Sequence, residues 1–377
     1  MKRLLILGAG SMQLPVIKKA KELGLYTLVA DYDPNAVGFQ YADQVAIIST
    51  NDLDAILSFA KEQQIDGILT TSDYPVNTVA YVGSQLALPA MSMDVAKICT
   101  NKYLQRELFR TASIKTPFYQ LCHDTTDMTV FADFPYIVKP VDSSASRGVK
   151  KVENKEQLVQ AFQEALYYSN KKEVLIESYI EGREFSVETF TQNQKTTIVS
   201  ITEKLTRGEE LGYFVEDTHI EPARITAEEN DLISAEVLSA ITAIGLDNCP
   251  SHTEVKLNSK GVYVIELACR LGGDYITSDL VPLSTGIDML GNLIRLSVGE
   301  RIDVKPSISK FSCVQFLNDE NYYLCTNLIE TGNKNIKRYE VYPYSDKPIH
   351  NSLDRLGFII FQTETQQELE NLLNQLR

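Results

Sequence analysis

Residues 1–95 alternate short apolar segments with amphipathic ones, and this alternation limits the possible folds more than any other feature of the chain. Apolar runs such as LLIL at 4–7 and LVA at 28–30 have the length of buried strands. The segments that follow such runs have the apolar spacing of helices, at 14–23, 53–63 and 76–86. Because strands that alternate with helices form parallel sheets, we expect a doubly wound α/β domain here.

The first strand leads into a glycine turn, Gly8-Ala9-Gly10, and the next strand ends at Asp31. A glycine turn followed about 20 residues later by an acidic residue is typical of a dinucleotide-binding site. The third glycine of that pattern is missing, since Gln13 stands there. An NAD-dependent oxidoreductase is therefore one alternative. Any ligand of this domain should lie at the carboxyl ends of the strands, where Asp73 is also found.

The composition excludes several classes of function. A net charge of −14 argues against nucleic acids and anionic membranes as principal partners. The six cysteines show no CxxC pair and the four histidines no zinc-binding spacing. No apolar run approaches the roughly 18–20 residues of a membrane span. We expect a cytoplasmic globular protein with reduced thiols.

Beyond residue 95 the pattern predicts further helices at 95–111, 155–168 and 227–244. Between the first two, YIVKPVDSSASRGV places Lys139 at the end of an apolar strand, directly before the loop 142–148. A lysine, serine hydroxyls and loop amides can together bind phosphate oxygens. The loop lacks the GK[ST] ending of a P-loop. An ordinary solvated hairpin loop is the alternative.

The segment VLIESYIEGREFSVETF contains a connector, 177–180, whose main-chain groups suit the edge of an adenine ring. On the strand that follows, Glu184 points to one side together with Ser186 and Glu188. A carboxylate such as Glu184 could accept both ribose hydroxyls. A solvated polar face is the alternative.

A predicted hairpin at 253–266 carries Glu254 and Glu266 on its two strands. Glu266 directly follows an apolar run, VYVI at 262–265. Burying its carboxylate there is costly unless a cation neutralises it. Two carboxylates with phosphate oxygens form a Mg²⁺ site. They share a face of the hairpin only if the turn has an odd number of residues or if Gly261 forms a β-bulge.

Four residues after Glu266, Arg270 could hold the charge of a transferring phosphoryl group. Gly272 and Gly273 leave room for the main chain to approach a substrate. A surface hairpin with a structural ion pair is the alternative. The last 75 or so residues, with a strand at 355–362 and a helix at 366–376, have the pattern of a small α+β appendage.

Taken in order, these segments resemble the ATP-grasp superfamily over most of the chain. They are most similar to the branch of L-amino acid ligases and carbamoyl-phosphate-synthase-like enzymes. The fragments that carry this resemblance are KPVDSSASRGV, EKL…YFVEDTHIEPA and HTEVKL…VIELACRLGGDYI. The resemblance implies an α/β and α+β architecture with a Rossmann-like pre-ATP-grasp domain (1–95), an ATP-grasp domain (96–300, with a lid subdomain at about 112–180) and a small C-terminal α+β domain (301–377).

The resemblance also implies the cofactors, ATP with Mg²⁺ or Mn²⁺, and a role for each matching residue. Glu254 and Glu266 would hold the metal ion. Arg270 and Lys139 would be catalytic, with Arg270 stabilising an acyl phosphate and the tetrahedral species that follows. ATP would be bound by Lys102, Lys139, Ser143, Ser144, Ser146, Arg147, Gly148, Glu177, Ile180 and Glu184. Substrates would be contacted by His219, His252, Gly272 and Gly273.

The implied activity is ADP-forming ligation of an amino acid or similar small carboxylate to an amine, in a protein that could be a homodimer. Many family members have Asn as a third metal ligand two residues after the second Glu, where this chain has Ala268. Two further alternatives therefore accompany the NAD-dependent oxidoreductase. One is a carbamoyl-phosphate-synthase-like enzyme that forms carboxyphosphate. The other is a nucleotide-binding module without turnover.

Overall fold

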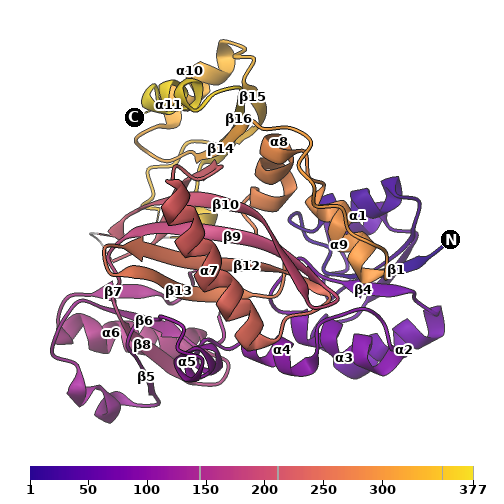
Figure 1. Ribbon diagram of the computed structural model, residues 1–377, viewed down its shortest axis with the longest axis horizontal. Coiled ribbons are helices and arrows are strands. Elements are labelled where there is room, and N and C mark those ends of the chain that lie inside the picture. Colours follow the sequence, from indigo (N-terminus) through magenta and orange to yellow (C-terminus); the bar gives the residue numbers. More distant parts are fainter. Residues whose placement is uncertain (144–145, 210–211, 350, 377) are drawn as a thin grey trace.

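A computed structural model of the protein describes residues 1–143, 146–209, 212–349 and 351–376. Within these residues the strands form two four-stranded sheets and one eight-stranded sheet. Figure 1 shows the large sheet in the centre, one small sheet at the lower left and the N-terminal sheet at the right.

The N-terminal sheet is parallel, with the strand order β3-β2-β1-β4, and it confirms the predicted α/β arrangement. Its strands are β1 (Arg3–Leu7), β2 (Tyr26–Asp31), β3 (Gln44–Ile47) and β4 (Gly67–Leu69). Its helices are α1 (Leu14–Glu22), α2 (Leu53–Gln63) and α3 (Val76–Leu86), with a 3-10 helix η1 (Val37–Tyr41).

Each face of this sheet packs into a different core. Leu5 and its neighbours on one face pack with α2 and α3, while Ile6 on the other face packs with α1 and with α9 (Met289–Ser297). Helix α9 comes from much later in the chain and lies beside α1 (Figure 1). Gly67 allows this approach, because a Cβ there would lie 2.5 Å from the main-chain oxygen of Ser297. The predicted boundaries of the first two domains are not tested by this packing and stay a prediction.

The single helix predicted at 95–111 is wrong. The structure has two helices, α4 (Met93–Cys99) and α5 (Lys102–Thr111). The side chain of Asn101 accepts a hydrogen bond from the main-chain nitrogen of Leu104 (3.0 Å) and so caps the start of α5. This N-cap geometry requires an extended residue, which interrupts the helical path at Asn101.

The second four-stranded sheet is antiparallel in the order β5-β8-β6-β7. Helix α6 (Lys155–Tyr168) packs against it through Leu158 and Phe162, which are buried with Val138 and Ile176 of the sheet. The 3-10 helix η2 (Thr125–Val130) closes one end of this core. The strands are β5 (Tyr119–Cys122), β6 (Tyr136–Pro140), β7 (Lys150–Val152) and β8 (Val174–Ser178).

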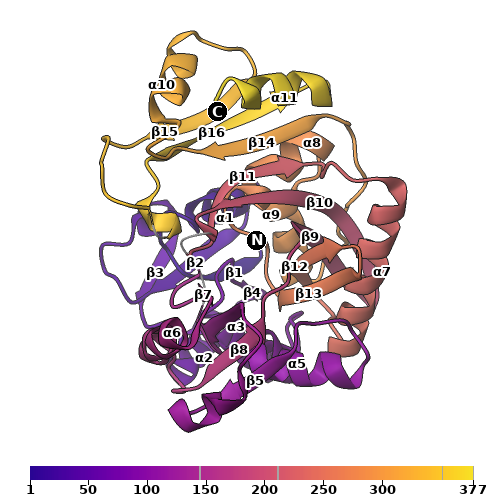
Figure 2. The same ribbon diagram turned by 90° about the vertical axis from the view of Figure 1, so that its left-hand side faces the viewer.

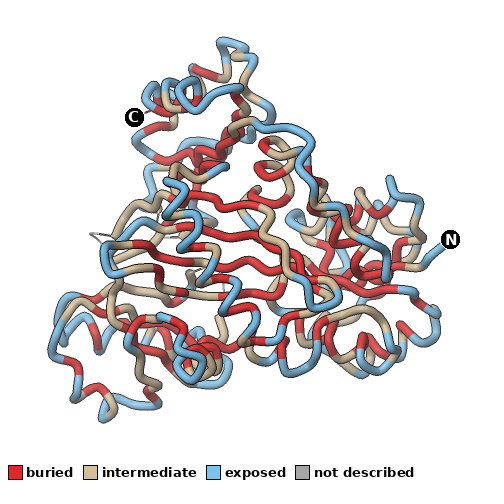
Figure 3. Tube along the Cα trace, in the orientation of Figure 1, coloured by how far each residue is buried: buried red, intermediate tan, exposed pale blue. Residues whose placement is uncertain are grey.

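The eight-stranded sheet is antiparallel, in the order β13-β12-β9-β10-β11-β14-β16-β15. Its first five strands in the chain are β9 (Arg183–Gln192), β10 (Lys195–Arg207), β11 (Val215–Glu221), β12 (Cys249–Asn258) and β13 (Gly261–Ala268). Helix α7 (Ala227–Ile244) crosses one face of this sheet (Figure 1), and the strands beneath it are largely buried (Figure 3). None of the helices in the described parts of the chain combines the length and hydrophobicity that a membrane crossing needs.

The C-terminal strands add to this same sheet, because β14 (Phe311–Phe316) pairs with β11. Strands β16 (Gly357–Thr363) and β15 (Ile336–Val341) follow at its edge, under the helices α10 (Tyr322–Glu330) and α11 (Gln366–Asn374) at the top of Figure 2. A π-helix (Ile276–Leu280) and α8 (Val281–Thr285) pack near β14, and a short 3-10 helix, η5 (Ser352–Asp354), precedes β16. The boundary predicted at 300 remains a prediction.

Glu221, at the end of β11, provides a pH-dependent contribution to stability. It is 2% exposed, and the Thr202 hydroxyl donates a hydrogen bond to it (2.8 Å). Burial raises the pKa of Glu221 to about 8, with a further increase from the nearby Glu188 charge. The folded state therefore keeps the proton that the unfolded state loses near pH 4.5, the ordinary value. Its stabilising contribution is full below pH 4.5 and is lost as the pH rises through 8.

We expect Glu221→Gln to remove this pH dependence, because the amide stays neutral at every pH. Relative to the parent protein, the variant should gain on the order of a few kcal/mol in free energy of unfolding between pH 5 and pH 8. Urea unfolding of both proteins at the two pH values measures this. An equal difference at pH 5 and pH 8 would show that Glu221 is ionised in the folded protein.

Candidate active site

The hairpin of β12 and β13 brings Glu254 and Glu266 directly opposite each other. The turn between the strands has two residues, since Asn258 pairs with Gly261, and an even turn alone would put the two carboxylates on opposite faces. A β-bulge at Ile265 shifts the register and places both on one face. Neither condition considered from the sequence is met, because the turn is even and the bulge lies at Ile265 instead of Gly261.

Each of these carboxylates is paired with a lysine. The Lys102 ammonium lies 2.8 Å from Glu266 Oε1, and the Lys204 ammonium lies 2.7 Å from Glu254 Oε1. Burial alone would raise the pKa of Glu254, but Lys204 and His252 outweigh it and hold the pKa well below its usual range. Glu254 is therefore ionised at neutral pH.

Lys139 belongs to a buried ion triad with Glu177 and Arg106. The Glu177 carboxylate lies 2.6 Å from Lys139 Nζ and 2.6 Å from Arg106 Nε, and its side chain is 2% exposed. Burial lowers the pKa of Lys139, and Glu177 only partly offsets this. The carboxylate of Glu177 thus faces the two cations, and its main chain lies in β8, paired with Tyr119 of β5 and Ile137 of β6.

The connector after β8 is partly used by the protein itself. The main-chain nitrogens of Ser178 and Tyr179 donate to Phe118 and Pro135, at 2.9 and 3.2 Å. Ile180 is half-buried and follows them. The Tyr179 phenol donates to Glu209 (2.5 Å). Hydrogen bonds within the protein therefore already use two main-chain donors of the predicted adenine-binding connector, those of Ser178 and Tyr179.

The predicted lid loop lies close to α5 and to the N-terminal domain. Lys102 Nζ donates to the main-chain oxygen of Ser143 (2.8 Å), and the Arg147 guanidinium lies 5.6 Å from the centre of the Tyr74 ring. Gly148 has φ +72° and packs on Tyr168, so a side chain there would be strained. Ser146 also has a positive φ, of 54°. Ser144 lies outside the described residues.

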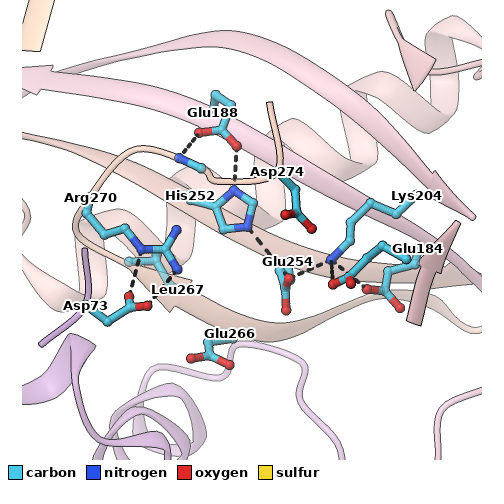
Figure 4. A network of polar contacts seen from close by, with 12 residues as sticks. Asp73, Glu184, Glu188, Lys204, His252, Glu254, Glu266, Leu267, Arg270 and Asp274 are labelled. Atoms are coloured by element: carbon cyan, nitrogen blue, oxygen red, sulfur yellow. Dashed lines mark hydrogen bonds and ion pairs between the residues drawn. The ribbon is translucent and has the colours of Figure 1, made fainter. Parts of the chain in front are cut away.

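Arg270 links the end of β13 to the N-terminal sheet. Its Nε and Nη2 donate to the two oxygens of Asp73, at 2.7 and 3.1 Å, in the bidentate arrangement seen in Figure 4. Burial alone would raise the pKa of Asp73, but Arg270 keeps it below its usual range. Asp73 stands at the carboxyl end of the N-terminal sheet, where a ligand was predicted.

His252 lies between Glu188 and Glu254 (Figure 4). Its Nδ1 is 2.5 Å from Glu188 Oε1, and its Nε2 is 3.7 Å from Glu254 Oε1. Burial alone would lower the pKa of His252, but Glu188 outweighs it and the pKa rises to about 9. The ring is thus an imidazolium at neutral pH. Its position two residues before Glu254 puts it on the same face of the sheet, opposite Ala268.

Gly272 packs against the His252–Glu188 pair, and its main-chain nitrogen donates a hydrogen bond to Glu188 Oε2 (3.1 Å). A Cβ at Gly272 would lie 2.5 Å from Glu188 Oε1 and 2.7 Å from His252 Nδ1. At Gly273 a Cβ would meet no atom within 4 Å. Close packing therefore requires a glycine at position 272 but not at position 273.

We expect Gly272→Ala to destabilise the protein by about 1–3 kcal/mol, because the added methyl must separate Glu188 from His252. Gly273→Ala is the matched control and should change stability by less than about 0.5 kcal/mol. Urea unfolding of the two variants tests this. Equal stabilities would mean that the loop after β13 relaxes freely.

His219 is placed differently from His252. His219 is 1% exposed and its ring lies against the Phe316 ring, and among the described residues neither ring nitrogen has a side-chain hydrogen-bond partner. Burial lowers the pKa of His219 to about 3, so the ring is neutral at physiological pH. The buried ring is thus held by packing, and Asp274 is an acidic group that acts on its charge in the opposite direction to burial.

Glu184 and several residues that the sequence did not single out surround the same site. Glu184 lies 3.2 Å from Lys204, and Glu216 lies 3.7 Å from it. Arg355, from the C-terminal region, lies 2.8 Å from Glu216 and 3.0 Å from Asp274. Lys204 follows Glu203 on a strand whose residues are mostly polar, so no local pattern singles it out, and its partners come from three other strands.

The glycine turn that suggested a dinucleotide site is filled by its own chain. Asp31 Oδ2 accepts a hydrogen bond from the main-chain nitrogen of Ala9 (2.7 Å), so this carboxylate is engaged within the turn. The Gln13 side chain lies over Gly8 and Gly10, within 3.2 Å of where their Cβ atoms would be. A proline in the first turn of α1 removes a donor that an anion would need. These contacts argue against NAD at this turn.

Comparison with known proteins agrees with this geometry. Residues 132–279 match the ATP-grasp domain family. The chain contains an ATP-grasp domain. The matched range of this ATP-grasp domain includes Lys139, Glu177, Glu254 and Arg270, whereas Lys102 precedes it.

Several known proteins resemble the chain beyond the ATP-grasp domain itself. An uncharacterised protein of Sinorhizobium fredii is 24% identical over 317 residues, covering 80% of this chain and 64% of that protein. The chain thus spans less than two thirds of this curated relative. The structure of an L-amino acid ligase from Bacillus licheniformis has a TM-score of 0.82 at 22% identity and covers 100% of this chain and 97% of that one.

A third comparison concerns the biotin carboxylase domain dimer of a Hydrogenobacter thermophilus 2-oxoglutarate carboxylase, solved with MgADP and bicarbonate. It has a TM-score of 0.75 at 18% identity and covers 100% of this chain and 89% of that one. These likenesses show that the whole chain has the ATP-grasp fold.

Proposed function

We propose that the protein is an ATP-dependent carboxylate–amine ligase that releases ADP and phosphate. An amino acid or similar small carboxylate is the proposed substrate, as in the B. licheniformis ligase that shares the fold. The observation that carries the proposal is the pair of facing carboxylates, Glu254 and Glu266, on the ATP-grasp hairpin, with Lys102 bound to Glu266 and Arg270 near enough for the Glu266 charge to act on it. A dehydrogenase would leave this arrangement without a role.

Two lysines are available to neutralise the phosphates of ATP. Lys139 is 5% exposed and held at a fixed position by Glu177, while Lys102 Nζ connects Glu266 to the lid loop through Ser143. Such buried cations act strongly on a polyphosphate, because little water screens them. Glu184, on the neighbouring strand β9, is the proposed partner of the ribose hydroxyls.

The carboxylates Glu254 and Glu266 fit a magnesium ion, since Mg²⁺ prefers hard oxygen ligands. Within the described residues no three His, Cys, Asp or Glu side chains gather closely enough to hold a metal alone. Phosphate oxygens of the nucleotide would therefore complete the ligand set. When bound, the ion would supply charge neutralisation at the β- and γ-phosphates.

The chemistry requires activation of the carboxylate, whose leaving group would otherwise be oxide. Transfer of the γ-phosphoryl group of ATP to a carboxylate oxygen breaks the γ-phosphate bond to ADP and forms an acyl phosphate. The amine then attacks the carbonyl carbon, loses a proton and expels phosphate. Arg270, held in one orientation by Asp73, would neutralise the negative charge on the transferring group. No protein nucleophile takes part.

A second candidate uses the same site with a different carboxylate. Bicarbonate would be phosphorylated to carboxyphosphate, as proposed for carbamoyl-phosphate-synthase-like enzymes. The fold shared with a biotin carboxylase domain solved with bicarbonate supports this candidate. That domain is described as a dimer, and we propose a homodimer here as well, which size-exclusion chromatography with light scattering would test.

The test of the proposed function is ADP release from Mg-ATP across a panel of amino acids, offered singly and in pairs, with and without bicarbonate. The ligase predicts release that requires a carboxylate and an amine together and that is lost in Glu266→Gln. Release that requires bicarbonate supports the second candidate. Absence of ATP binding in the parent protein would reject both.

A further inference from the structure

The ammonium of Lys204 lies at the meeting point of three carboxylates from three neighbouring strands of the large sheet. Its Nζ is 2.7 Å from Glu254 on β12, 3.2 Å from Glu184 on β9 and 3.7 Å from Glu216 on β11. The Lys204 side chain is 5% exposed. Figure 4 shows the Lys204 ammonium between the carboxylates of Glu254 and Glu184.

This lysine connects the two ends of the proposed nucleotide site. Glu184 is the proposed ribose ligand and Glu254 the proposed metal ligand, and Lys204 contacts both. Each carboxylate also has a cation of its own: Glu184 lies 3.7 Å from Lys256, Glu254 lies 3.7 Å from His252 Nε2, and Glu216 lies 2.8 Å from Arg355, closer than to Lys204. Lys204 is thus the cation that the three carboxylates share.

Three carboxylates around one point attract a divalent cation, because Mg²⁺ and Mn²⁺ bind carboxylate oxygens. In this structure a fixed amine fills that point. The second proposed metal ligand, Glu266, is likewise neutralised by Lys102 at 2.8 Å. No three His, Cys, Asp or Glu side chains of the described residues form a ready metal site, although three carboxylates lie within 3.7 Å of the Lys204 ammonium.

We propose that Lys204 is a built-in counter-ion that positions Glu184 and Glu254 and keeps free divalent metal out of the site. The metal ion then enters only with the nucleotide, whose phosphates supply the missing ligands. Lys204 acts through the two carboxylates and is a positioning residue. This inference rests on the proposed function, because it takes Glu254 as a metal ligand.

The proposal predicts a gain of metal binding when the lysine is removed. Binding of Mn²⁺ is measured from the loss of the free-ion signal in electron paramagnetic resonance, without nucleotide. Lys204→Met should bind Mn²⁺ at least about tenfold more tightly than the parent protein, a difference of about 1.4 kcal/mol. A merely structural lysine would not produce this gain.

The matched control is Lys256→Met, which removes a neighbouring buried lysine that contacts Glu184 at 3.7 Å but is not paired with Glu254. It should bind Mn²⁺ as weakly as the parent protein. In the double variant Lys204→Met with Glu254→Gln, the gained affinity should be lost, which locates the ion at this cluster. Lys204→Gln, which keeps a hydrogen-bond donor, replaces Lys204→Met if that variant does not fold.

The outcomes separate this inference from the proposed function. If the parent protein binds Mn²⁺ only together with ADP, and Lys204→Met binds it without ADP, the inference holds. If the folded variants show no gain, or if the parent protein binds Mn²⁺ equally well with and without ADP, it is overturned while the ligase stands. If the parent protein binds no Mn²⁺-ADP, the proposed function itself fails.

Discussion

Replacing Glu177 by glutamine is expected to destabilise the protein by about 3–5 kcal/mol, because it leaves two buried cations facing a neutral amide. Arg106 is 0% exposed and Lys139 is 5% exposed, so neither can turn to water without a change in the fold. Binding of ATP should weaken as well, since Glu177 holds Lys139 in place. Urea unfolding and a nucleotide-binding titration measure the two effects.

Glu181→Gln is the control for this prediction, because Glu181 lies four residues further along the chain and is exposed. Its stability should stay within about 0.5 kcal/mol of the parent protein. A loss below 1 kcal/mol in Glu177→Gln would mean that water already solvates Lys139 and Arg106.

Replacing Arg270 by lysine is expected to lower the rate of ADP release by at least about a hundredfold, with ATP affinity changed only a few-fold. A lysine keeps one positive charge but cannot form the paired hydrogen bonds that Arg270 makes to Asp73. The loss should therefore fall on turnover and not on nucleotide binding. Steady-state rates and an ATP titration separate the two.

Arg338→Lys is the control here, because Arg338 also pairs with an aspartate, Asp279, but lies on the edge strand β15 and is 46% exposed. It should retain the parent rate. An Arg270→Lys variant with unchanged turnover would remove Arg270 from the proposed chemistry and leave it as a structural link to Asp73.

Much of the secondary structure follows from local periodicity. The apolar spacing predicts α2, α3, α6 and α7 with the bounds that the structure has. The break before α5 was missed because it depends on one side chain, Asn101, that competes with the helix for a main-chain donor. The common sheet of the ATP-grasp strands and the C-terminal strands was also missed, because strand pairing between distant segments leaves no local pattern.

In the site, too, local features were predictable from the sequence and contacts between distant segments were not. Glu254 and Glu266 stand out in the sequence as carboxylates on apolar strands, but the bulge at Ile265 that brings them together depends on pairing between the strands. The partners of Arg270 and Lys204 were not predictable, because Asp73 lies 197 residues from Arg270 and Glu184, Glu216 and Glu254 come from three strands. Sequence spacing fixes which face a residue occupies and not which distant residue it meets.

The measurement that tests the central claim most directly is the fate of ¹⁸O from a labelled carboxylate substrate. Once the panel has identified a carboxylate and an amine that support ADP release, the carboxylate is labelled and the released phosphate is analysed by mass spectrometry. The ligase predicts one ¹⁸O atom in each phosphate, since a carboxylate oxygen bridges to phosphorus in the acyl phosphate. Phosphate that carries no label would contradict the account and show that water, not the carboxylate, accepts the phosphoryl group.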